Sequence, residues 1–360
     1  MKRIVYVLPA RAGGGGVHSI VQEGAEMAKM GIDVAVLVPA KHLMSFRTQY
    51  ALDIVRGIGL CAYHGVDTIA DAIAGADVVI ATVFTSVNLV KEALELVPRG
   101  ERPRPAYYIQ DYEPLFCEPH SEMWNQAMAS YEAIDDMILF AKTRWLCEQV
   151  ERHHRRRVEL VEPSIDHDTY YPDFQRPDRP RMFTAMLRPS TPRRAPARTA
   201  RILSWLASEH DDVEAHAFGC SRHELEEAGI VLDPRVKCHG SLRREEVAAL
   251  LRASHFFLDL SDYQAFGRTA VEAMASGCVP VVPALGGARE TIEDGISGIV
   301  VDTFDEASIE KASELALRVD SEVLAHWCMS AVNCAAVMSL RRAALRTVAT
   351  FTARLPRKRV

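Results

Sequence analysis

The sequence predicts a two-domain α/β protein in which each domain is built on a parallel β-sheet covered by helices on both faces. The chain has 360 residues, of which 48% are hydrophobic and 25% charged, enough for two cored domains. Apolar runs of strand length alternate with segments of helical periodicity. This alternation restarts after a proline- and arginine-rich zone, residues 171–201, so we expect a domain boundary near the beginning of that zone.

The first half opens with a predicted strand, a glycine cluster and a helix. The strand covers residues 4–8, the cluster is Gly13 to Gly16, and the helix covers residues 17–30 before Gly31 ends it. This order places backbone N–H groups and a helix N-terminus at the end of a strand, where an anion can bind, although a glycine run can also be a simple tight turn. Further strands are expected at residues 33–38, 77–81 and 106–109.

The second half repeats the pattern. Strands are expected at residues 182–187, 213–218, 236–239, 255–260, 279–283 and 298–301, with helices at 244–252 and 268–276. The final segment, from about residue 306, is interpreted as helix with a basic tail at residues 354–360.

The overall composition excludes several classes of protein. Lys and Arg total 42 against 48 Asp and Glu, a net charge of −6, so no global positive field indicates a nucleic-acid partner. The eight cysteines contain no Cys-x-x-Cys pair, unlike a zinc site or a disulfide framework, which favours a reducing cytoplasm. The apolar run at the start ends at Pro9, too short for a signal peptide or a membrane span, so we expect a soluble protein.

The most informative segment is SDYQAFGRTAVEAMASGCVPVV, residues 261–282. A strand ends in a polar loop, Phe266 and Gly267 turn the chain, and a helix begins near Arg268. The amides at the start of that helix face the space above the sheet, where ligands bind in open α/β folds. Glu272 lies one turn further along the same helix face, where a carboxylate can accept hydrogen bonds from vicinal hydroxyls such as those of a ribose.

This segment resembles the signature of glycosyltransferase family 4 (glycosyl transferases group 1), a member of the GT-B superfamily. The family pattern is Glu, seven residues, Glu, then Ala-Met-Ala-x-Gly-x-Pro-Val; here Gln264 replaces the first Glu, Glu272 is the second, and AMASGCVP follows. Residues 286–302, GGARETIEDGISGIVVD, also match the family's downstream run. The resemblance implies a GT-B fold, two Rossmann-like doubly wound parallel-sheet domains facing across a cleft, with a nucleoside diphosphate sugar as donor and no cofactor or metal.

Residues 164–172, SIDHDTYYP, resemble the family's interdomain pattern Gly-Val-Asp, three residues, Phe, x, Pro. We therefore expect an acceptor domain at residues 1–168, a donor domain at 169–335, and a C-terminal helix and tail at 336–360 that packs back on the first domain. Asp166 and Asp168 form an Asp-x-Asp triplet that would suggest a metal in other transferases. In a hinge, the resemblance favours a structural role for them.

The donor residues follow from the same resemblance. Arg188 and Arg193 reproduce the family's basic pair that grips the donor diphosphate, a task that suits the bidentate guanidinium, and Arg194 is a third contact. A solvated basic loop is the alternative interpretation. The complete set of expected donor-binding residues is Gly14, Gly15, Gly16, Arg188, Arg193, Arg194, Phe266, Gly267, Arg268, Thr269 and Glu272.

The first domain departs from the family near the catalytic positions. Thr82 stands where the second His of a common His-x-His falls, and Gln110 with Asp111 replaces a common His-Asp. Together with RPSTPRR, residues 188–194, these changes resemble a bacterial branch that includes rhamnosyltransferases. Gln264, Asp111 and Thr82 are the expected catalytic positions, and His18, Gln110 and Glu113 the expected acceptor contacts. Asp111 and Glu113 can orient or deprotonate a hydroxyl, or can form a surface turn; His18 can face the cleft or pack the helix start.

The resemblance implies transfer of a glycosyl group, rhamnose among the candidates, from a UDP- or dTDP-linked donor to a glycan or lipid-linked acceptor, with retention, in glycan biosynthesis. The alternatives are a GT-B-fold sugar-nucleotide epimerase and a non-catalytic nucleotide-sugar-binding protein, the latter motivated by Gln264 and Thr82. The basic clusters at residues 152–157 and 357–359 are either solvated surface or, with a lipid-linked acceptor, a peripheral membrane contact.

Overall fold

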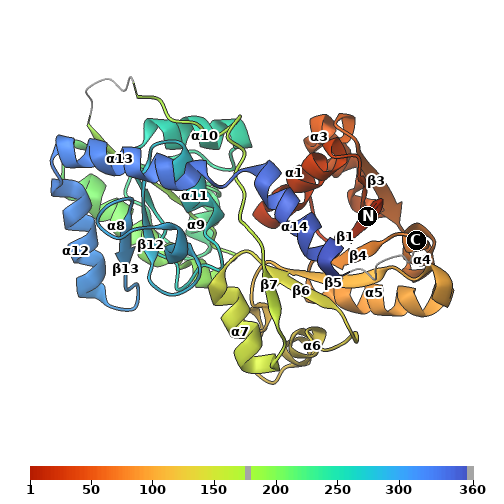
Figure 1. The fold of residues 1–360 in the computed structure, drawn as a ribbon. Helices are drawn as coiled ribbons and strands as arrows, with labels where there is room; N and C mark the ends of the chain where they lie inside the picture. Colours follow the sequence, from red (N-terminus) through yellow and green to blue (C-terminus); the bar gives the residue numbers. More distant parts are fainter. Residues whose placement is uncertain (175–179, 355–360) are drawn as a thin grey trace. The chain divides into compact units, whose positions relative to one another are not determined.

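The computed structural model describes residues 1–174 and 180–354, and the chain folds into two compact units (Figure 1). Unit 1 contains Met1–Ser164 together with the segment that begins at Ser339, and unit 2 contains Ile165–Met338. The chain thus passes from one unit to the other after Ser164 and after Met338; the expected boundaries were 168/169 and 335/336. The predicted basic tail at residues 357–359 lies outside the described residues.

Unit 1 is built on a parallel sheet with the strand order β3-β2-β1-β4-β5-β6-β7 in its described part. The order reverses between the neighbours β1 and β4, and the crevice at such a switch point is where ligands bind in doubly wound sheets. The strands are β1 (Arg3–Val7), β2 (Asp33–Pro39), β3 (Ile58–Tyr63), β4 (Val78–Ala81), β5 (Arg104–Ile109), β6 (Ile138–Ala141) and β7 (Val158–Leu160).

Helices cover this sheet, and the last helix of the chain belongs to the same unit. The α-helices are α1 (Gly15–Lys29), α2 (Leu43–Gln49), α3 (Ala51–Val55), α4 (Val66–Ile73), α5 (Phe84–Leu96), α6 (Glu122–Ser130), α7 (Arg144–His154) and α14 (Leu340–Arg354). The short 3₁₀ turns are η1 (Ala40–His42), η2 (Arg99–Glu101) and η3 (Glu113–Phe116). α14 lies beside α1 (Figure 1), and its buried Ala344 and Phe351 share an apolar core with Ile20 of α1 and Phe140 of β6.

Unit 2 has a second parallel sheet, with the order β10-β9-β8-β11-β12-β13 in its described part. Its switch point falls between β8 and β11. The strands are β8 (Arg181–Met186), β9 (Val213–Phe218), β10 (Lys237–Cys238), β11 (Phe256–Leu258), β12 (Val279–Pro283) and β13 (Ile299–Val301).

Two apolar clusters bury the faces of this sheet. One includes Leu203 and Trp327, and the other includes Leu251 and Met274. The helices are α8 (Pro196–Glu209), α9 (Arg222–Glu227), α10 (Arg244–Ala253), α11 (Arg268–Ala275), α12 (Glu306–Arg318) and α13 (Ser321–Ala336), with 3₁₀ turns η4 (Pro192–Arg194) and η5 (Ala288–Thr291).

The structure corrects two parts of the sequence interpretation. The segment from residue 306 contains three helices, α12, α13 and α14, rather than one. Val319 adopts extended backbone angles, and Asp320 caps the next helix by accepting hydrogen bonds from the amides of Glu322 and Val323 at 3.0 and 2.9 Å. The strands β3, β6 and β7 were not predicted; β3 forms one edge of the sheet, and β6 and β7 lie toward the opposite edge. Among the helices described, none is long and apolar enough to cross a bilayer.

Candidate functional site

Three of the sequence motifs of unit 2 lie on loops that follow three neighbouring strands. Arg188 follows β8, Gln264 follows β11, and Gly286 follows β12; β8 pairs with β11, and β11 pairs with β12. Because the strands are parallel, all three loops leave the carboxyl edge of the sheet, at its switch point. The fold therefore gathers at one edge of the sheet motifs that lie far apart in the chain, from Arg188 to Gly286.

The loop after β8 carries the predicted basic group. Desolvation, and then the neighbouring Arg193 guanidinium, lower the pKa of Arg188, so two positive charges lie close together here. The Arg193 guanidinium also lies over the Tyr263 ring, 5.4 Å from its centroid, and the Arg193 carbonyl accepts the Asp262 amide at 2.8 Å. These contacts hold the basic loop against the loop after β11, and an anion of two or more charges is the ligand that such a pair favours.

The loop after β11 is fixed to the loop after β12 through Gln264. The Gln264 carbonyl accepts hydrogen bonds from the amides of Gly287 and Ala288, at 2.7 and 3.3 Å. Gly286 has φ +107°, and a Cβ there would lie 2.1 Å from the Gln264 carbonyl oxygen. A close approach of backbone to backbone thus requires glycine at position 286, the first glycine of the predicted motif.

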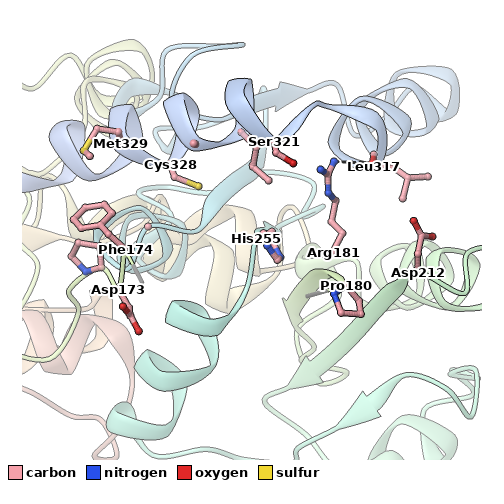
Figure 2. A pocket seen from close by; sticks show the side chains of 14 residues that line it. Asp173, Phe174, Pro180, Arg181, Asp212, His255, Leu317, Ser321, Cys328 and Met329 are labelled. Carbon is pink, nitrogen blue, oxygen red and sulfur yellow. Dashed lines mark hydrogen bonds between the residues drawn. The ribbon is translucent and has the colours of Figure 1, made fainter. Parts of the chain in front are cut away.

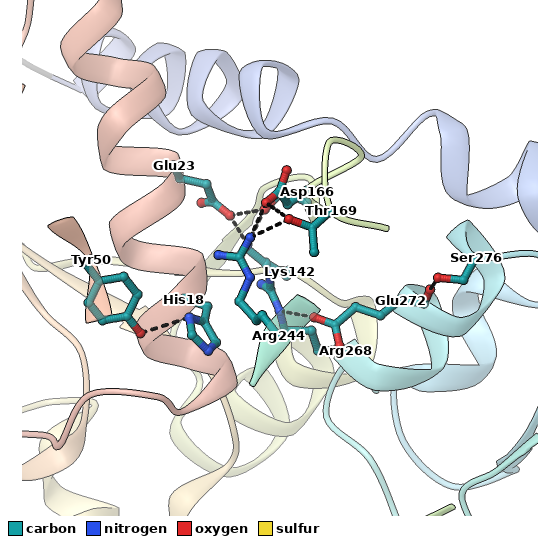
Figure 3. A network of polar contacts seen from close by, with 11 residues as sticks. His18, Glu23, Tyr50, Lys142, Asp166, Thr169, Arg244, Arg268, Glu272 and Ser276 are labelled. Carbon is teal, nitrogen blue, oxygen red and sulfur yellow. Dashed lines mark hydrogen bonds and ion pairs between the residues drawn. The ribbon is translucent and has the colours of Figure 1, made fainter. Parts of the chain in front are cut away.

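Helix α11 begins directly after the loop that follows β11. Gly267 precedes it in the left-handed conformation, φ +75°, and a Cβ there would lie 2.7 Å from the Cβ of Ala288. Phe266 and Thr269 on either side are partly exposed. Glu272 lies one turn further along the same face of α11, as expected, and forms an ion pair of 2.9 Å with Arg268, which was not predicted (Figure 3).

Glu272 is almost completely enclosed within unit 2. Its side chain accepts a hydrogen bond from the hydroxyl of Tyr170, and the guanidinium of Arg244 is near. Burial raises the pKa of Glu272, while Arg268 and then the other partners oppose that rise. The carboxylate is therefore held in one orientation before any ligand arrives.

Asp166 of the predicted Asp-x-Asp triplet is engaged by protein groups. It forms an ion pair with Arg244, and it accepts a hydrogen bond of 2.8 Å from Thr169, whose hydroxyl also accepts from Arg244 at 2.8 Å (Figure 3). These contacts fasten residues 166–169 to α10 and support a structural role for Asp166. In the residues that the structure describes, no cluster of three or more His, Cys, Asp or Glu side chains has the arrangement of a metal site.

In unit 1, the structure brings together the ends of β1, β4 and β5. The Gln110 side chain lies over Gly16, where a Cβ would come within 1.8 Å of its Oε1, and its Nε2 donates to the Thr82 carbonyl at 3.2 Å. The catalytic role predicted for Thr82 does not agree with this geometry. Its side chain is fully buried, and its hydroxyl donates to the Val7 carbonyl at 2.8 Å, which joins β4 to β1.

His18 lies on α1, one turn beyond the glycines, and is largely buried. Its Nδ1 lies 2.9 Å from the hydroxyl oxygen of Tyr50, which also accepts the Gly13 amide at 3.3 Å (Figure 3). His18 therefore packs the start of the helix, which was the structural alternative at this position; its acceptor role stays a prediction, as does the anion-binding role of Gly14, Gly15 and Gly16.

Asp111 and Glu113 differ in environment although they are two residues apart. Asp111 is partly exposed and accepts the Tyr112 amide at 2.9 Å. Glu113 is buried: one carboxylate oxygen, Oε2, accepts the Tyr107 hydroxyl at 2.7 Å and the Phe84 amide at 2.5 Å, and the acceptor contact of this residue stays a prediction. Glu113 thus stabilises the N-terminus of α5. Burial, opposed by these two hydrogen bonds, raises the pKa of Glu113 to about 7.

This shift predicts a pH-dependent stability. Because the folded pKa, about 7, exceeds the unfolded value of 4.5, the folded state binds the proton more tightly, so the free energy of unfolding falls as pH rises between those values. Glu113 is expected to account for about 3 kcal/mol of this decline in the free energy of unfolding. In Glu113→Gln, which mimics the protonated acid, this part of the decline should disappear in denaturant titrations at pH 5 and pH 8. Glu118→Gln, at an exposed position nearby, is the control; equal slopes in wild type and Glu113→Gln would contradict the prediction.

Two buried charged groups were not predicted from the sequence. Asp259, at the end of the strand predicted over residues 255–260, is buried after β11, and its Oδ2 accepts the Gln264 Nε2 at 2.7 Å. Lys142 follows β6 and pairs with Glu23 of α1 inside unit 1. A lysine or aspartate after an apolar strand was the available signal, since such residues are rarely buried unless paired.

A separate pocket of about 730 Å³ lies elsewhere in unit 2 (Figure 2). Its lining includes Arg181, Asp212 and His255, which stand at or just before the starts of β8, β9 and β11, and therefore at the amino edge of the sheet. Arg181 donates to the carbonyls of Ala316 and Leu317 at 3.0 and 2.7 Å, closing the end of α12. None of the predicted site residues lines this pocket as described, so the candidate site is the opposite, carboxyl edge.

Comparison with known proteins finds similarity to one protein family in unit 2. The model of the family described as Glycosyl transferases group 1 matches residues 217–327, which lie within unit 2. Over these residues the chain is similar to that family.

The most informative relatives are glycosyltransferases of bacteria. The chain is 24% identical over 253 residues to the D-inositol 3-phosphate glycosyltransferase of Geodermatophilus obscurus, covering 64% of this chain and 52% of that protein. It is 29% identical over 92 residues to the GDP-mannose:cellobiosyl-diphosphopolyprenol alpha-mannosyltransferase of Xanthomonas oryzae pv. oryzae, covering 25% of this chain and 24% of the relative. The alignments thus span about half or less of these relatives' own length.

Solved structures establish the fold. Anabaena Alr3699/HepE, crystallised in complex with UDP and glucose, superposes with a TM-score of 0.78 over 98% of this chain and 100% of its own, at 15% identity. WaaG, a glycosyltransferase involved in lipopolysaccharide biosynthesis, superposes with a TM-score of 0.72 over 97% and 99%, also at 15% identity. The chain therefore has the predicted GT-B fold. The rhamnosyltransferase branch suggested by three short motifs has no counterpart among these matches.

Proposed function

We propose that this chain transfers a glycosyl group from a nucleoside diphosphate sugar to an acceptor hydroxyl. The observation that carries the proposal is that Arg188 and Arg193 share one loop at the carboxyl edge of the unit 2 sheet. Arg193 holds this loop against the loop that leads to the N-terminus of α11. The diphosphate leaves as an anion in such a transfer, and fixed positive groups aimed at that charge are the main source of catalysis.

We assign different parts of the donor to different residues around the basic loop. Glu272, already oriented by Tyr170 and Arg268, accepts hydrogen bonds from the ribose, and Gln264 contacts the sugar. An amide at Gln264 cannot act as a nucleophile, so double displacement through that position is disfavoured. We propose retention, with the departing phosphate taking the acceptor proton and no metal required, since Asp166 is already engaged by Arg244.

The identities of the donor sugar and of the acceptor are separate, more specific proposals. The names of the relatives refer to an inositol phosphate acceptor in one case and to GDP-mannose with a lipid-linked acceptor in another. We keep dTDP-rhamnose among the donor candidates, because Gln110, Asp111 and the basic loop resemble a branch that includes rhamnosyltransferases. A lipid-linked acceptor would use the exposed basic residues at the end of α7, such as Arg152 and Arg155, as a contact with anionic lipid, and would place the protein at the cytoplasmic membrane face.

A two-step experiment tests the proposed function. Thermal shifts with UDP-, dTDP- and GDP-sugars identify the donor, because a ligand at 100 times its dissociation constant stabilises the folded state by about 2.7 kcal/mol. Turnover of that donor is then measured with and without glycan and lipid-linked acceptors. Nucleoside diphosphate release that depends on an acceptor supports a transferase. Conversion of the donor sugar without acceptor would indicate an epimerase instead, and binding without any turnover a binding protein.

A further inference from the structure

A buried carboxylate lies beside the position where this chain departs from its family signature. Asp259 follows β11 and is 7% exposed, and Gln264, five residues later, is 3% exposed. The Gln264 Nε2 donates to Asp259 Oδ2 at 2.7 Å and to the Ser261 hydroxyl oxygen at 3.0 Å, while the Ser261 hydroxyl itself donates to Asp259 Oδ1. The three side chains form one closed polar cluster inside the loop.

The chemistry of this cluster determines which way the Gln264 amide faces. An ionised carboxylate only accepts hydrogen bonds, so the NH₂ group of the amide must be the end that meets Asp259. The Gln264 backbone is held independently by Gly287 and Ala288, which prevents the side chain from reorienting by moving the loop. The amide oxygen is therefore turned away from Asp259.

We propose that Asp259 is a positioning residue for the donor site. It presents the amide oxygen of Gln264, rather than the nitrogen, to a hydroxyl of the donor sugar. This inference rests on the proposed function for the donor, but the geometry of the pair does not depend on it.

The same pair explains why the first acid of the family signature is an amide in this chain. A glutamate at position 264 would place a second carboxylate at hydrogen-bond distance from Asp259 in a buried loop. Two carboxylates so close cannot both ionise without strong repulsion. The uncharged amide at position 264 avoids this repulsion and can donate a hydrogen bond to the carboxylate at position 259.

Asp259 also reaches the phosphate side of the site. Its Oδ2 lies 3.9 Å from the Arg194 guanidinium, on the loop after β8. One carboxylate therefore contacts both the amide assigned to the sugar and an arginine assigned to the diphosphate, which couples the two parts of the donor site.

The test is a mutant cycle with Gln264→Glu, Asp259→Asn and the double variant. The probe is the sugar nucleotide that stabilises the wild type most in the thermal-shift panel, together with its diphosphate lacking the sugar. Gln264→Glu should weaken binding of the sugar nucleotide by about tenfold or more, the expected cost of losing an oriented hydrogen bond in a buried site. Binding of the diphosphate without sugar should change by less than about threefold, a difference that general misfolding would not produce.

In the double variant, the amide introduced at position 259 can donate to the carboxylate introduced at position 264, so affinity for the sugar nucleotide should return to within about threefold of the wild type. Asp262→Asn is the matched control: it removes a carboxylate from the same loop, one that pairs with Arg198 at 2.9 Å. Equal affinities in the wild type and Gln264→Glu, or a double variant that is folded but not rescued, would overturn the inference.

A donor-free measurement separates this inference from the proposed function. In Gln264→Glu, the thermal midpoint should fall relative to the wild type as pH is raised from about 5 to 8, because both carboxyls then ionise. This difference should vanish in the double variant. A pH response in Gln264→Glu equal to that of the wild type overturns the pair itself. If the wild type binds no nucleotide of the panel, the proposed function and the donor contact are both wrong. The pH response of the thermal midpoint still shows whether Asp259 and Gln264 interact as described.

Discussion

Replacing both Arg188 and Arg193 by alanine is expected to weaken binding of a nucleoside diphosphate by at least about a hundredfold, since each hydrogen bond to a charged group contributes about 1.5–3 kcal/mol. The two guanidiniums lie on one loop, close enough that Arg193 lowers the pKa of Arg188. A bound diphosphate would relieve this repulsion, so the two contributions should support each other.

Single lysine substitutions refine the same prediction. Arg188→Lys and Arg193→Lys keep the charge but lose the planar, bidentate donor pair. Intermediate losses, smaller than those of the alanine variants, would show that geometry contributes as well as charge. Arg193→Lys would also weaken the contact with the Tyr263 ring and so loosen the loop.

The control for the double alanine variant is Arg201→Ala, on α8 of the same unit. This side chain is half exposed and pairs with Glu306, so its loss changes net charge without touching the loop. Affinity is measured calorimetrically with the diphosphate selected from the donor panel. Binding by the double variant within about threefold of the wild type would remove the basic pair from the donor site.

The unit 2 site was predictable because its information is local. The strand, the polar loop, Gly267 and the spacing from Arg268 to Glu272 are all contained in one stretch, and a strand followed by a helix has few arrangements. In the structure Arg268 and Glu272 do share one face of α11, 2.9 Å apart. Parallel pairing of β8, β11 and β12 then brings the basic loop and the glycine pair to the same edge, as expected for a doubly wound sheet.

The unit 1 residues were harder to interpret because their roles depend on distant partners. Thr82 was assigned by its alignment with a family histidine, but β4 lies next to β1, and the Thr82 hydroxyl meets the Val7 carbonyl 75 residues away. Glu113 follows a pair of tyrosines in a turn-like segment, and its burial results from the Phe84 amide at the start of α5. No spacing within either segment indicates these contacts.

A buried ion pair in unit 1 was likewise not predictable from local spacing. Its loss has the largest expected effect on stability. Lys142 and Glu23 are 119 residues apart, and each side chain is 5% exposed. The Ser164 hydroxyl donates to the same Glu23 oxygen, and Lys142 donates to Ser164 at 3.3 Å (Figure 3 shows the first two residues). The ammonium also lies 5.6 Å from the centre of the Tyr108 ring. The cluster joins α1, the end of β6 and the last residue of unit 1 before unit 2.

Lys142→Met is expected to lower the free energy of unfolding of unit 1 by about 3–5 kcal/mol, because it leaves the Glu23 carboxylate buried without its counter-charge. Lys29→Met is the control on α1: this lysine is half exposed and pairs with Glu26, and its loss should change stability by no more than about 0.5 kcal/mol. Hydrogen exchange measures the effect in each unit separately, with β1 and β6 amides reporting on unit 1 and β8 and β11 amides as the internal reference.

The double variant Lys142→Met with Glu23→Leu distinguishes a missing counter-charge from a packing defect. Replacing both members of a buried ion pair by apolar side chains of similar size is often neutral or stabilising, so most of the loss should be recovered. A residual cost of about 1–2 kcal/mol is expected, because the Ser164 hydroxyl then loses its acceptor. If the double variant is no more stable than Lys142→Met, the lost stability came from the packing of the lysine stem over Tyr108 rather than from the isolated charge. A loss below about 1 kcal/mol in Lys142→Met, or equal losses in the β8 and β11 amides, would show that this ion pair does not hold unit 1 together.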